Sequence, residues 1–345
     1  MRAARRFTTV VALGLTAAVV LTGCTKKNDT DTATGSTGGS TAKIKVAFVP
    51  KLQGVPYFEA MNAGGKAAAA ELGNVEWLYQ GPTTADAAAQ ADIVRSYIQQ
   101  KVNTLIVAPN DPDSMAPLLQ QAKDAGIHVA TSDTDAPNSV REAFVNQATA
   151  EGIGQGLTDA LLTAMGGKGK YAIVSCGQTA ENLNSWIAVQ KAYTAQKYPG
   201  VQIVDTVYAG EDQAKATQMA TDLMSAHPDL TGLVGECTSS APGVAQAVKD
   251  AGKIGKVFTV GLGTPQSMKP YLADGSSTAA ILWDVENLGY LTAWAGAQLA
   301  EDKPFAATND VSSKLTGITY DSASKMLLLG PALAITKDNV DQFNY

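Results

Sequence analysis

The chain has 345 residues, with 26 lysines and arginines against 32 aspartates and glutamates, so its formal net charge is −6. An acidic folded surface argues against nucleic acid as a partner. The two histidines, His128 and His227, lie far apart, and the sequence has no Cys/His cluster with the spacing of a zinc site. We therefore expect neither a metal site nor a resident cofactor. The length suffices for two domains of ordinary size.

Residues 1–23 are predicted to form a bacterial lipoprotein signal peptide. Three arginines precede an apolar run at residues 11–23, which is shorter than the roughly 20 residues that span a bilayer. The run ends in the sequence LTGC, which resembles the lipobox of bacterial lipoproteins. This resemblance implies cleavage before Cys24, lipidation of Cys24 and an extracytoplasmic protein anchored to the cell membrane. Loss of the three arginines changes the net charge from −6 to −9.

Residues 24–42 are predicted to form a flexible tether. After Cys24 they include no aromatic or large aliphatic side chain, and Thr, Gly, Ser and Asp dominate. Such a segment buries too little apolar surface to fold by itself. We therefore expect the folded part of the chain to begin near Lys43.

Short apolar segments rich in β-formers then alternate with helical segments. In the first series we expect strands at residues 45–49, 75–79, 104–108 and 128–132, and helices at residues 57–72, 85–100 and 113–125. In the second series we expect strands at residues 171–175, 201–208, 230–235 and 257–262, and helices at residues 183–198, 213–226, 241–251 and 266–274. This alternation predicts parallel βαβ units with helices on both faces of each sheet.

The two series predict an α/β protein with two doubly wound parallel-sheet domains joined by a hinge. We assign residues 43–147 plus about 285–310 to the N-terminal domain. Residues 148–284 plus about 311–345 then form the C-terminal domain and tail. Ligands of open α/β sheets bind beyond the carboxyl ends of the strands. In a protein with two such domains, this rule places the site in the cleft between them.

The hinge is expected to consist of a few connecting segments between the two domains. Candidate connections lie near Gln147, near residues 274–284 and near residues 309–317. Domain closure about such connections is a common response of two-domain proteins to a ligand that binds in the cleft. We therefore expect the ligand to bring the two domains together.

Residues 43–345 resemble the type I periplasmic sugar-binding proteins of ABC transporters. Three of the segments that carry the resemblance read VAFVPKLQGVPYFEAMNAGGKAAAAELG, FVNQATAEGIG and ILWDVENLGYLTAWA. The opening P-K-x-x-G-x-P-Y-F and the S-D-T-D turn are most similar to the branch that contains rhamnose-binding proteins and autoinducer-2 receptor lipoproteins. The resemblance implies a monomer that captures a small sugar, such as the deoxyhexose rhamnose, and delivers it to the permease of an ABC importer.

The alternative is a sensory receptor for a sugar or for an autoinducer-2-like furanose, which the sequence does not separate from transport. An enzyme is not expected, because the motifs of common enzyme classes are missing from the sequence. Residues 152–156 read GIGQG rather than G-x-G-x-x-G, and GGKGK at residues 166–170 lacks the spacing of a phosphate-binding loop. The sequence also has no G-x-S-x-G nucleophile elbow.

The candidate ligand residues of the N-terminal domain follow its strands. Lys51 resembles the hydroxyl- or carbonyl-binding lysine of the family, the alternative being a solvated surface lysine. Of Tyr57 and Phe58, we expect one to line the cleft and the other to pack in the core. Asp133 ends a strand and is expected to accept hydrogen bonds from two adjacent sugar hydroxyls. Asp135 either shares this task or caps a turn.

The candidate ligand residues of the C-terminal domain depart from the autoinducer-2 receptors. Asn182 stands where those receptors carry Asp, and Glu236 and Thr238 stand where they carry Pro and Ala. These differences disfavour autoinducer-2 as the ligand. Trp283 and Asp284 lie at an expected crossing between the domains, where they would stack on and bond to the ligand. Core packing is the alternative for Trp283.

Cys176 and Cys237 are expected at the carboxyl ends of the first and third strands of the C-terminal domain. In a sheet of order 2-1-3-4-5 these two strands are neighbours, close enough for a disulfide. Export would make the oxidised form accessible. The sequence leaves two alternatives open, a disulfide that braces two loops of the cleft, or two reduced cysteines that point to opposite faces.

Overall fold

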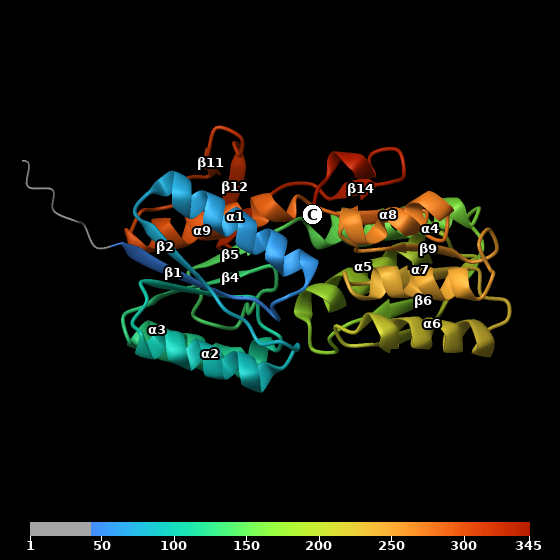
Figure 1. Cartoon of the computed structure of the whole chain (residues 1–345), viewed down its shortest axis with the longest axis horizontal. Helices are drawn as coiled ribbons and strands as arrows, with labels where there is room; N and C mark the ends of the chain where they lie inside the picture. Colours follow the sequence, from blue (N-terminus) through green and yellow to red (C-terminus); the bar gives the residue numbers. More distant parts are fainter. Residues whose placement is uncertain (1–42) are drawn as a thin grey trace, which may run out of the picture. The chain divides into compact units, whose positions relative to one another are not determined.

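The structure, a computed structural model, describes residues 43–345. The predicted signal peptide (residues 1–23), the predicted lipidation site Cys24 and the predicted tether (residues 24–42) lie outside the described residues. Among the helices of residues 43–345, none combines the length and the apolar character needed to cross a membrane. The described chain folds around two separate β-sheets, each with helices on both faces (Figure 1).

The first sheet has eight strands in the order β11-β12-β13-β5-β4-β3-β1-β2. Their bounds are β1 Ile44–Val49, β2 Val75–Tyr79, β3 Thr104–Val107, β4 His128–Ser132, β5 Ala143–Asn146, β11 Thr308–Asn309, β12 Ile318–Asp321 and β13 Met326–Leu328. The strands from β2 to β13 run parallel, and β12 and β11 are antiparallel to their neighbours. Strand β3 is buried along its whole length, as expected where helices cover both faces of a parallel sheet.

Four helices cover the first sheet. Helices α1 (Pro56–Leu72) and α9 (Val285–Ala300) pack together on one face, and α2 (Ala87–Gln99) and α3 (Pro112–Asp124) pack on the other (Figure 1). Helices α1 and α9 approach closely because glycines lie at their crossing. A Cβ atom at Gly289 would overlap the backbone carbonyl of Met61, so no larger residue fits there without displacing a helix.

The second sheet has six strands in the order β14-β10-β9-β8-β6-β7. Their bounds are β6 Gly169–Ser175, β7 Val201–Tyr208, β8 Gly232–Gly235, β9 Phe258–Gly261, β10 Ala279–Leu282 and β14 Leu333–Ile335. All are parallel except β14, which pairs antiparallel with β10. The five parallel strands follow the order 2-1-3-4-5, and strands β1 to β5 of the first sheet follow the same order. The prediction of two doubly wound parallel-sheet domains is confirmed.

Helices also cover both faces of the second sheet. Helices α4 (Ala150–Ala164) and α5 (Glu181–Lys197) pack on one face, whereas α6 (Gln213–Ala226) and α7 (Ser240–Asp250) pack together on the other. Helix α8 (Pro265–Asp274) packs against α7 and β10, and a short 3-10 helix, η1 (Val340–Gln342), packs on α8. We call the first sheet with its helices the first lobe, and the second sheet with its helices the second lobe.

The chain crosses between the lobes at three places. It passes from β5 to α4 at residues 147–149, from β10 to α9 at residues 283–284, and from β13 to β14 at residues 329–332. The third crossing differs from the expected one at residues 309–317, and residues 318–328 belong to the first lobe rather than the second. The reason is that β13 pairs with β5 and β12 pairs with β13, which covers an otherwise free sheet edge.

Candidate ligand-binding site

The segments that follow the parallel strands of both lobes line a common cavity, at the position where open α/β sheets bind their ligands. The first lobe contributes Lys51, Val55, Tyr57, Phe58 and Asp133 to its wall. The second lobe and the crossing after β10 contribute Asn182, Leu183, Trp186, Glu211, Cys237, Thr238, Leu262, Leu282 and Trp283. The wall therefore mixes a few polar groups with aromatic and aliphatic side chains.

Asp133 is the most firmly held carboxylate of the cavity. It follows β4 with a backbone φ of 68°, in the left-handed region that non-glycine residues seldom adopt. Its Oδ1 accepts a hydrogen bond from the Tyr57 hydroxyl at 2.7 Å, and its Oδ2 accepts one from the Thr134 hydroxyl at 2.9 Å. An uncommon backbone conformation that is fixed by hydrogen bonds is typical of functional positions.

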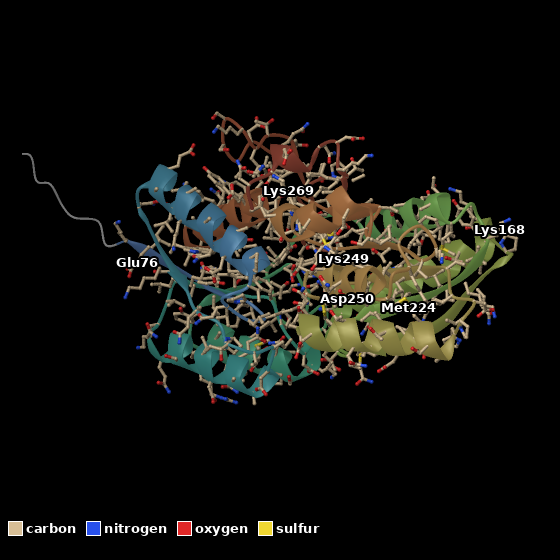
Figure 2. The ribbon with its side chains drawn as sticks, turned by 45° about the vertical axis from the view of Figure 1, so that its right-hand side comes forward. Glu76, Lys168, Met224, Lys249, Asp250 and Lys269 are labelled. Atoms are coloured by element: carbon tan, nitrogen blue, oxygen red, sulfur yellow. A yellow bond between two sulfur atoms is a disulfide. The ribbon has the colours of Figure 1, made fainter. Side chains whose placement is uncertain are left out.

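Lys51 is buried, with 5 % of its surface exposed, whereas lysines such as Lys168, Lys249 and Lys269 lie on the outside of the molecule (Figure 2). Its Nζ lies 3.8 Å from Asp133 Oδ2 and donates a hydrogen bond to Asn182 Oδ1 at 3.0 Å, which links the two lobes. An ammonium carries three hydrogens. The Lys51 ammonium therefore has the capacity to donate to a ligand as well.

Aromatic rings form the apolar side of the cavity. Trp283 meets Tyr57 edge-on with ring centroids 5.9 Å apart, and its Nε1 donates a hydrogen bond to the Tyr57 hydroxyl at 3.1 Å. Trp186 lies 5.8 Å from Trp283, and Phe58 lies 5.0 Å from Tyr57. Burial and then the negative charge of Asp133 raise the pKa of Tyr57 well above its usual range. The Tyr57 hydroxyl thus remains a hydrogen-bond donor to Asp133.

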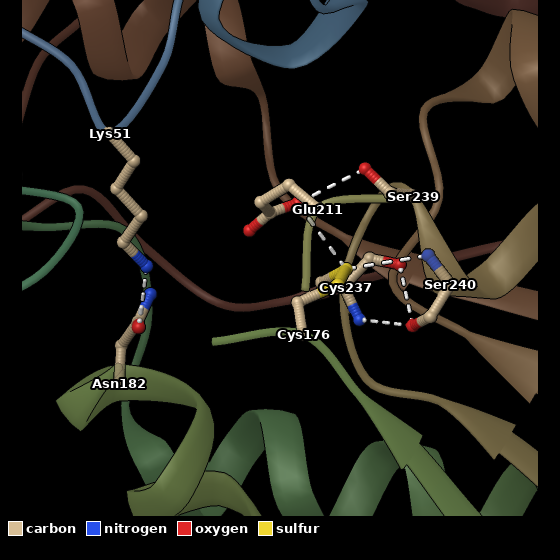
Figure 3. Close-up of a disulfide and its surroundings, with 7 residues drawn as sticks. All are labelled: Lys51, Cys176, Asn182, Glu211, Cys237, Ser239 and Ser240. Atoms are coloured by element: carbon tan, nitrogen blue, oxygen red, sulfur yellow. Dashed lines mark hydrogen bonds between the residues drawn. A yellow bond between two sulfur atoms is a disulfide. The ribbon is translucent and has the colours of Figure 1, made fainter. Parts of the chain in front are cut away.

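Cys176 and Cys237 form a disulfide that joins the ends of the neighbouring strands β6 and β8, with their Cα atoms 6.1 Å apart. Of the two alternatives that the sequence left open, the structure therefore has the disulfide. The disulfide lies at the cavity, because Cys237 forms part of the wall (Figure 3). Both sulfurs are used in this bond, so they are not available as thiolate ligands for a metal ion with the nearby Glu211.

Most of the predicted site residues meet at this cavity. The predicted residues in its wall are Lys51, Tyr57, Phe58, Asp133, Asn182, Thr238 and Trp283. Both Tyr57 and Phe58 contribute to the wall, although we expected one of them to pack away from it. Each ring is also almost fully buried, because α1 begins directly at the cavity and its first turn faces both the cavity and the core.

Three predicted residues lie outside the cavity wall, because each is engaged elsewhere. Asp135 accepts hydrogen bonds from Arg141 Nη2 and the Thr131 hydroxyl, both at 2.7 Å. Asp284 caps α9 through a hydrogen bond from the Asn287 backbone N–H at 2.8 Å. The third, Glu236, is described next.

Glu236 points into the core of the second lobe. Its side chain is fully buried, and both carboxyl oxygens lie 2.7 Å from Gln190 Nε2 on α5. Burial raises the pKa of Glu236 to about 8, although the hydrogen bond from Gln190 acts in the opposite direction. The carboxyl group of Glu236 therefore bonds to α5 inside the lobe and does not form part of the cavity wall.

Sequence reasoning missed Glu211 and Trp186, which also line the cavity. Glu211 follows β7 at the same edge of the sheet as the disulfide. The rule that selected Asp133, an acidic residue soon after a strand, applies equally to Glu211. Trp186 lies within α5, where an aromatic residue is usually taken for core, and no pattern in the sequence distinguishes it.

The chain matches the family model described as "Periplasmic binding protein domain" over residues 46–304. It is 30 % identical over 277 residues to the D-ribose/D-allose-binding protein of Pseudomonas aeruginosa, covering 77 % of this chain and 84 % of that protein. It is 26 % identical over 259 residues to the D-allose-binding periplasmic protein of Escherichia coli, covering 72 % of this chain and 82 % of that protein.

Solved structures with a similar fold also carry sugar-like ligands. LsrB from Clostridium saccharobutylicum in complex with AI-2 has a TM-score of 0.82 and 27 % identity, covering 88 % of this chain and 100 % of that one. An ABC transporter solute-binding protein from Clostridium phytofermentas with bound L-rhamnose has a TM-score of 0.80 and 27 % identity, covering 88 % of this chain and 98 % of that one.

Proposed function

The chain belongs to the periplasmic binding protein domain family, as a type I sugar-binding protein of ABC transporters and not an enzyme, and we propose that its ligand is a neutral monosaccharide of the deoxyhexose class, such as rhamnose. In this proposal the sugar binds between the two lobes. The closed protein then delivers it to the permease of an ABC importer. The protein acts as a monomer.

The observation that carries the proposal is the joining of polar and aromatic groups from both lobes in one cavity. Asp133 and Lys51 come from the first lobe, Asn182 comes from the second, and Trp283 lies at a crossing between them. Carboxylate, ammonium and amide groups give a sugar's hydroxyls fixed donors and acceptors, whereas aromatic rings suit its C–H faces.

A deoxyhexose is favoured by the apolar residues at the second lobe's side of the cavity. Leu183, Leu262 and Leu282 line it there, next to Trp186. A methyl group in place of a hydroxyl suits such a surface, since a hydroxyl would be buried without a partner. The solute-binding protein of similar fold that carries L-rhamnose supports this class of ligand.

Calorimetric titration tests the proposal. Deoxyhexoses, pentoses, polyols and autoinducer-2 are titrated separately into the protein, and each mixture is then analysed for products. We expect one neutral monosaccharide to bind reversibly with a stoichiometry of one, and to be recovered unchanged. Release of a product from any of these compounds would overturn the proposal, and so would the failure of every one of them to bind.

Ligand binding is expected to stabilise contact between the lobes. Three hydrogen bonds already link them, from Lys51 Nζ to Asn182 Oδ1, from Asn182 Nδ2 to the Asp133 carbonyl at 3.4 Å, and from the Thr179 hydroxyl to the Asn110 carbonyl at 2.9 Å. A sugar that bonds to both lobes adds to these links and shifts the protein toward closed conformations. Small-angle X-ray scattering should show a smaller radius of gyration with saturating sugar, and identical profiles would count against closure.

The alternative is a sensory receptor for a sugar or an autoinducer-2-like furanose; the similar fold of LsrB in complex with AI-2 bears on the class of ligand and not on the choice between sensing and transport. A receptor would pass its closed form to a membrane kinase or chemoreceptor instead of a permease. Sugar uptake by cells that lack the protein separates the two functions. Loss of uptake supports transport, whereas normal uptake with a lost transcriptional or chemotactic response supports sensing.

Attachment to the membrane through lipid on Cys24 is part of the proposal. It rests on the LTGC sequence and on the polar segment at residues 25–42, which would separate the anchor from the folded part. Replacement Cys24→Ala should release the protein from the membrane fraction with its sugar affinity unchanged, because the lipid alone holds it there. A mutant that stays in the membrane fraction would exclude this anchor.

A further inference from the structure

Three charged residues line the cavity within residues 43–345, namely Lys51, Asp133 and Glu211. The Lys51 ammonium lies 3.8 Å from Asp133, so these two charges largely offset each other. In the described part of the chain, no cationic group lies within ion-pair distance of Glu211. When Glu211 is ionised, the cavity wall carries one excess negative charge.

Glu211 is also incompletely hydrogen-bonded. Its Oε2 accepts a hydrogen bond from the Ser239 hydroxyl at 3.0 Å and lies 3.5 Å from Cys237 Sγ, which carries no hydrogen in the disulfide. A carboxylate offers about four acceptor positions, so most of its capacity remains for a ligand. Figure 3 shows Glu211 next to the disulfide, with Lys51 and Asn182 across the space that Glu211 and Lys51 both line.

The position of Glu211 is unfavourable for an ionised carboxylate in the absence of a ligand. Burial raises its pKa and the charge of Asp133 adds to this effect, while Lys51 and the Ser239 hydroxyl act in the opposite direction. Glu211 is partly buried, and a partly buried carboxylate without a cation beside it costs stability. Residues that reduce the stability of the free protein are common in binding sites, where the ligand supplies the missing partner.

We propose that Glu211 is a specificity-determining residue that sets the charge class of the ligand. It selects for hydroxyl or ammonium donors and against carboxylate or phosphate groups at its end of the cavity. The proposal rests on the function proposed above and adds the exclusion of sugar acids and sugar phosphates. An ammonium would offset the excess charge of the wall, whereas a second anion would meet Glu211 without a cation to offset it.

Matched sugars of different charge test this proposal by calorimetry. D-Galactose, D-galactosamine and D-galacturonate form one series, and L-rhamnose and L-rhamnose 1-phosphate form another, so that every member keeps its pyranose ring. We expect each acid to bind at least tenfold more weakly than its neutral parent. In Glu211→Gln, the neutral sugars should bind roughly 10- to 100-fold more weakly, and the difference between acid and parent should shrink. An acid that binds wild-type protein as tightly as its neutral parent would overturn the proposal.

Glu181→Gln is the matched control. Glu181 is a half-buried carboxyl residue at the start of α5 that lines a neighbouring cavity beside Asp133 and Asn182, outside the inner wall. Its pKa is raised by burial and then by the charge of Asp135, so its environment is similar to that of Glu211. We expect this substitution to leave the discrimination between neutral and acidic sugars unchanged. An equal loss of this discrimination in both variants would show that the summed negative charge around the cleft causes it, and not Glu211 in particular.

Thermal unfolding without ligand gives a second test that needs no sugar to bind. Because Glu211 is expected to reduce stability, the melting temperature of Glu211→Gln should equal or exceed that of wild type. A clear decrease would show that Glu211 serves to hold the Ser239 loop, which would overturn a role in specificity. If no compound of either series binds wild-type protein, the proposed function fails, and this measurement still decides whether Glu211 has a structural role.

Discussion

The two sides of the cavity are built in different ways. On the first-lobe wall, formed by Lys51, Tyr57 and Asp133, the polar side chains contact one another, with Asp133 bound by Tyr57 and close to Lys51. On the second-lobe wall, formed by Asn182, Glu211 and Thr238, the residues come from separate segments. There a disulfide, rather than a network of polar side chains, fixes the ends of two strands.

This difference indicates that the two walls have different roles in binding. A network of mutually bonded groups holds its geometry before the ligand arrives, so we infer that the first-lobe wall orients the sugar. The second-lobe wall keeps unused hydrogen-bonding capacity at Glu211, so we infer that it selects among sugars and responds to closure. The following predictions test this division, from the largest expected effect to the smallest, with the effect of Glu236 taken per pH unit.

Removal of the disulfide should have the largest effect. The bond closes a loop with a sequence separation of 61 residues, for which the chain-entropy model gives about 4 kcal/mol of stability. We expect Cys176→Ser/Cys237→Ser to lose up to this amount in urea unfolding, and to bind sugar more weakly because the second-lobe wall loosens. Thiol counting on the denatured, unreduced Cys24→Ala protein should find no free thiol. Two free thiols would show that Cys176 and Cys237 are not bonded, so that no disulfide fixes the second-lobe wall.

Asp133→Ala should produce the second largest effect. It should lower the affinity for sugar and leave the second-lobe wall unchanged. Loss of hydrogen bonds to a charged group should weaken sugar binding by about 1.5–3 kcal/mol. Alanine also tolerates the φ of 68° poorly, so some stability should be lost. Asp133→Asn is the control, because asparagine accepts this backbone conformation and keeps one acceptor for Tyr57. Wild-type affinity in calorimetric titration of both variants would exclude Asp133 from the site.

Glu236, which is buried next to Gln190 behind the second-lobe wall, should make the free energy of unfolding depend on pH. Between its ordinary pKa of 4.5 and about 8, Glu236 keeps its proton in the folded protein but loses it in the unfolded chain. The folded state therefore binds more protons, and the free energy of unfolding should fall by up to about 1.4 kcal/mol per pH unit as pH rises through this window.

Glu236→Gln should remove this decline, because glutamine stays neutral at every pH. Urea unfolding of both proteins between about pH 5 and pH 8 measures the difference. The two stability curves should diverge as pH rises, with the variant the more stable at the upper end. Parallel curves would show that Glu236 is ionised in the folded protein.

Tyr57→Phe should have the smallest effect and should act on the first-lobe wall alone. The Tyr57 hydroxyl donates to Asp133 at 2.7 Å and accepts from Trp283 Nε1 at 3.1 Å. Its loss should reduce sugar affinity by about 1 kcal/mol, the usual net value of one hydrogen bond. The discrimination between neutral and acidic sugars, which we assign to Glu211, should not change. A changed discrimination in calorimetry would contradict the division between the two walls.

The sequence was sufficient for the main architecture and for the first-lobe wall. Apolar strands followed by helices predicted both sheets, and polar residues directly after strands identified Lys51 and Asp133 as part of a common cavity. The neighbouring positions of Cys176 and Cys237 followed from the strand order, although only the structure distinguished a disulfide from two thiols. These features depend on local patterns and on the regular topology of doubly wound sheets.

Other features depend on contacts that the sequence does not encode locally. β12 and β13 were assigned to the wrong lobe, because the partner of β13 is β5, some 180 residues earlier in the chain. Glu236 follows a strand just as Asp133 does, but its side chain turns toward Gln190 in the core. The direction of a side chain just beyond a strand is set by tertiary packing, which no periodicity in the sequence reports.

A crystal structure with the best-binding neutral sugar would test the central claim most directly. The account predicts one sugar in the cavity between the lobes, with its hydroxyls within hydrogen-bond distance of Asp133 and Lys51 on one side and of Glu211 or Asn182 on the other. Trp283 or Trp186 should face its C–H surface. A sugar bound outside this cavity, or bound within it to residues of one lobe only, would contradict the account.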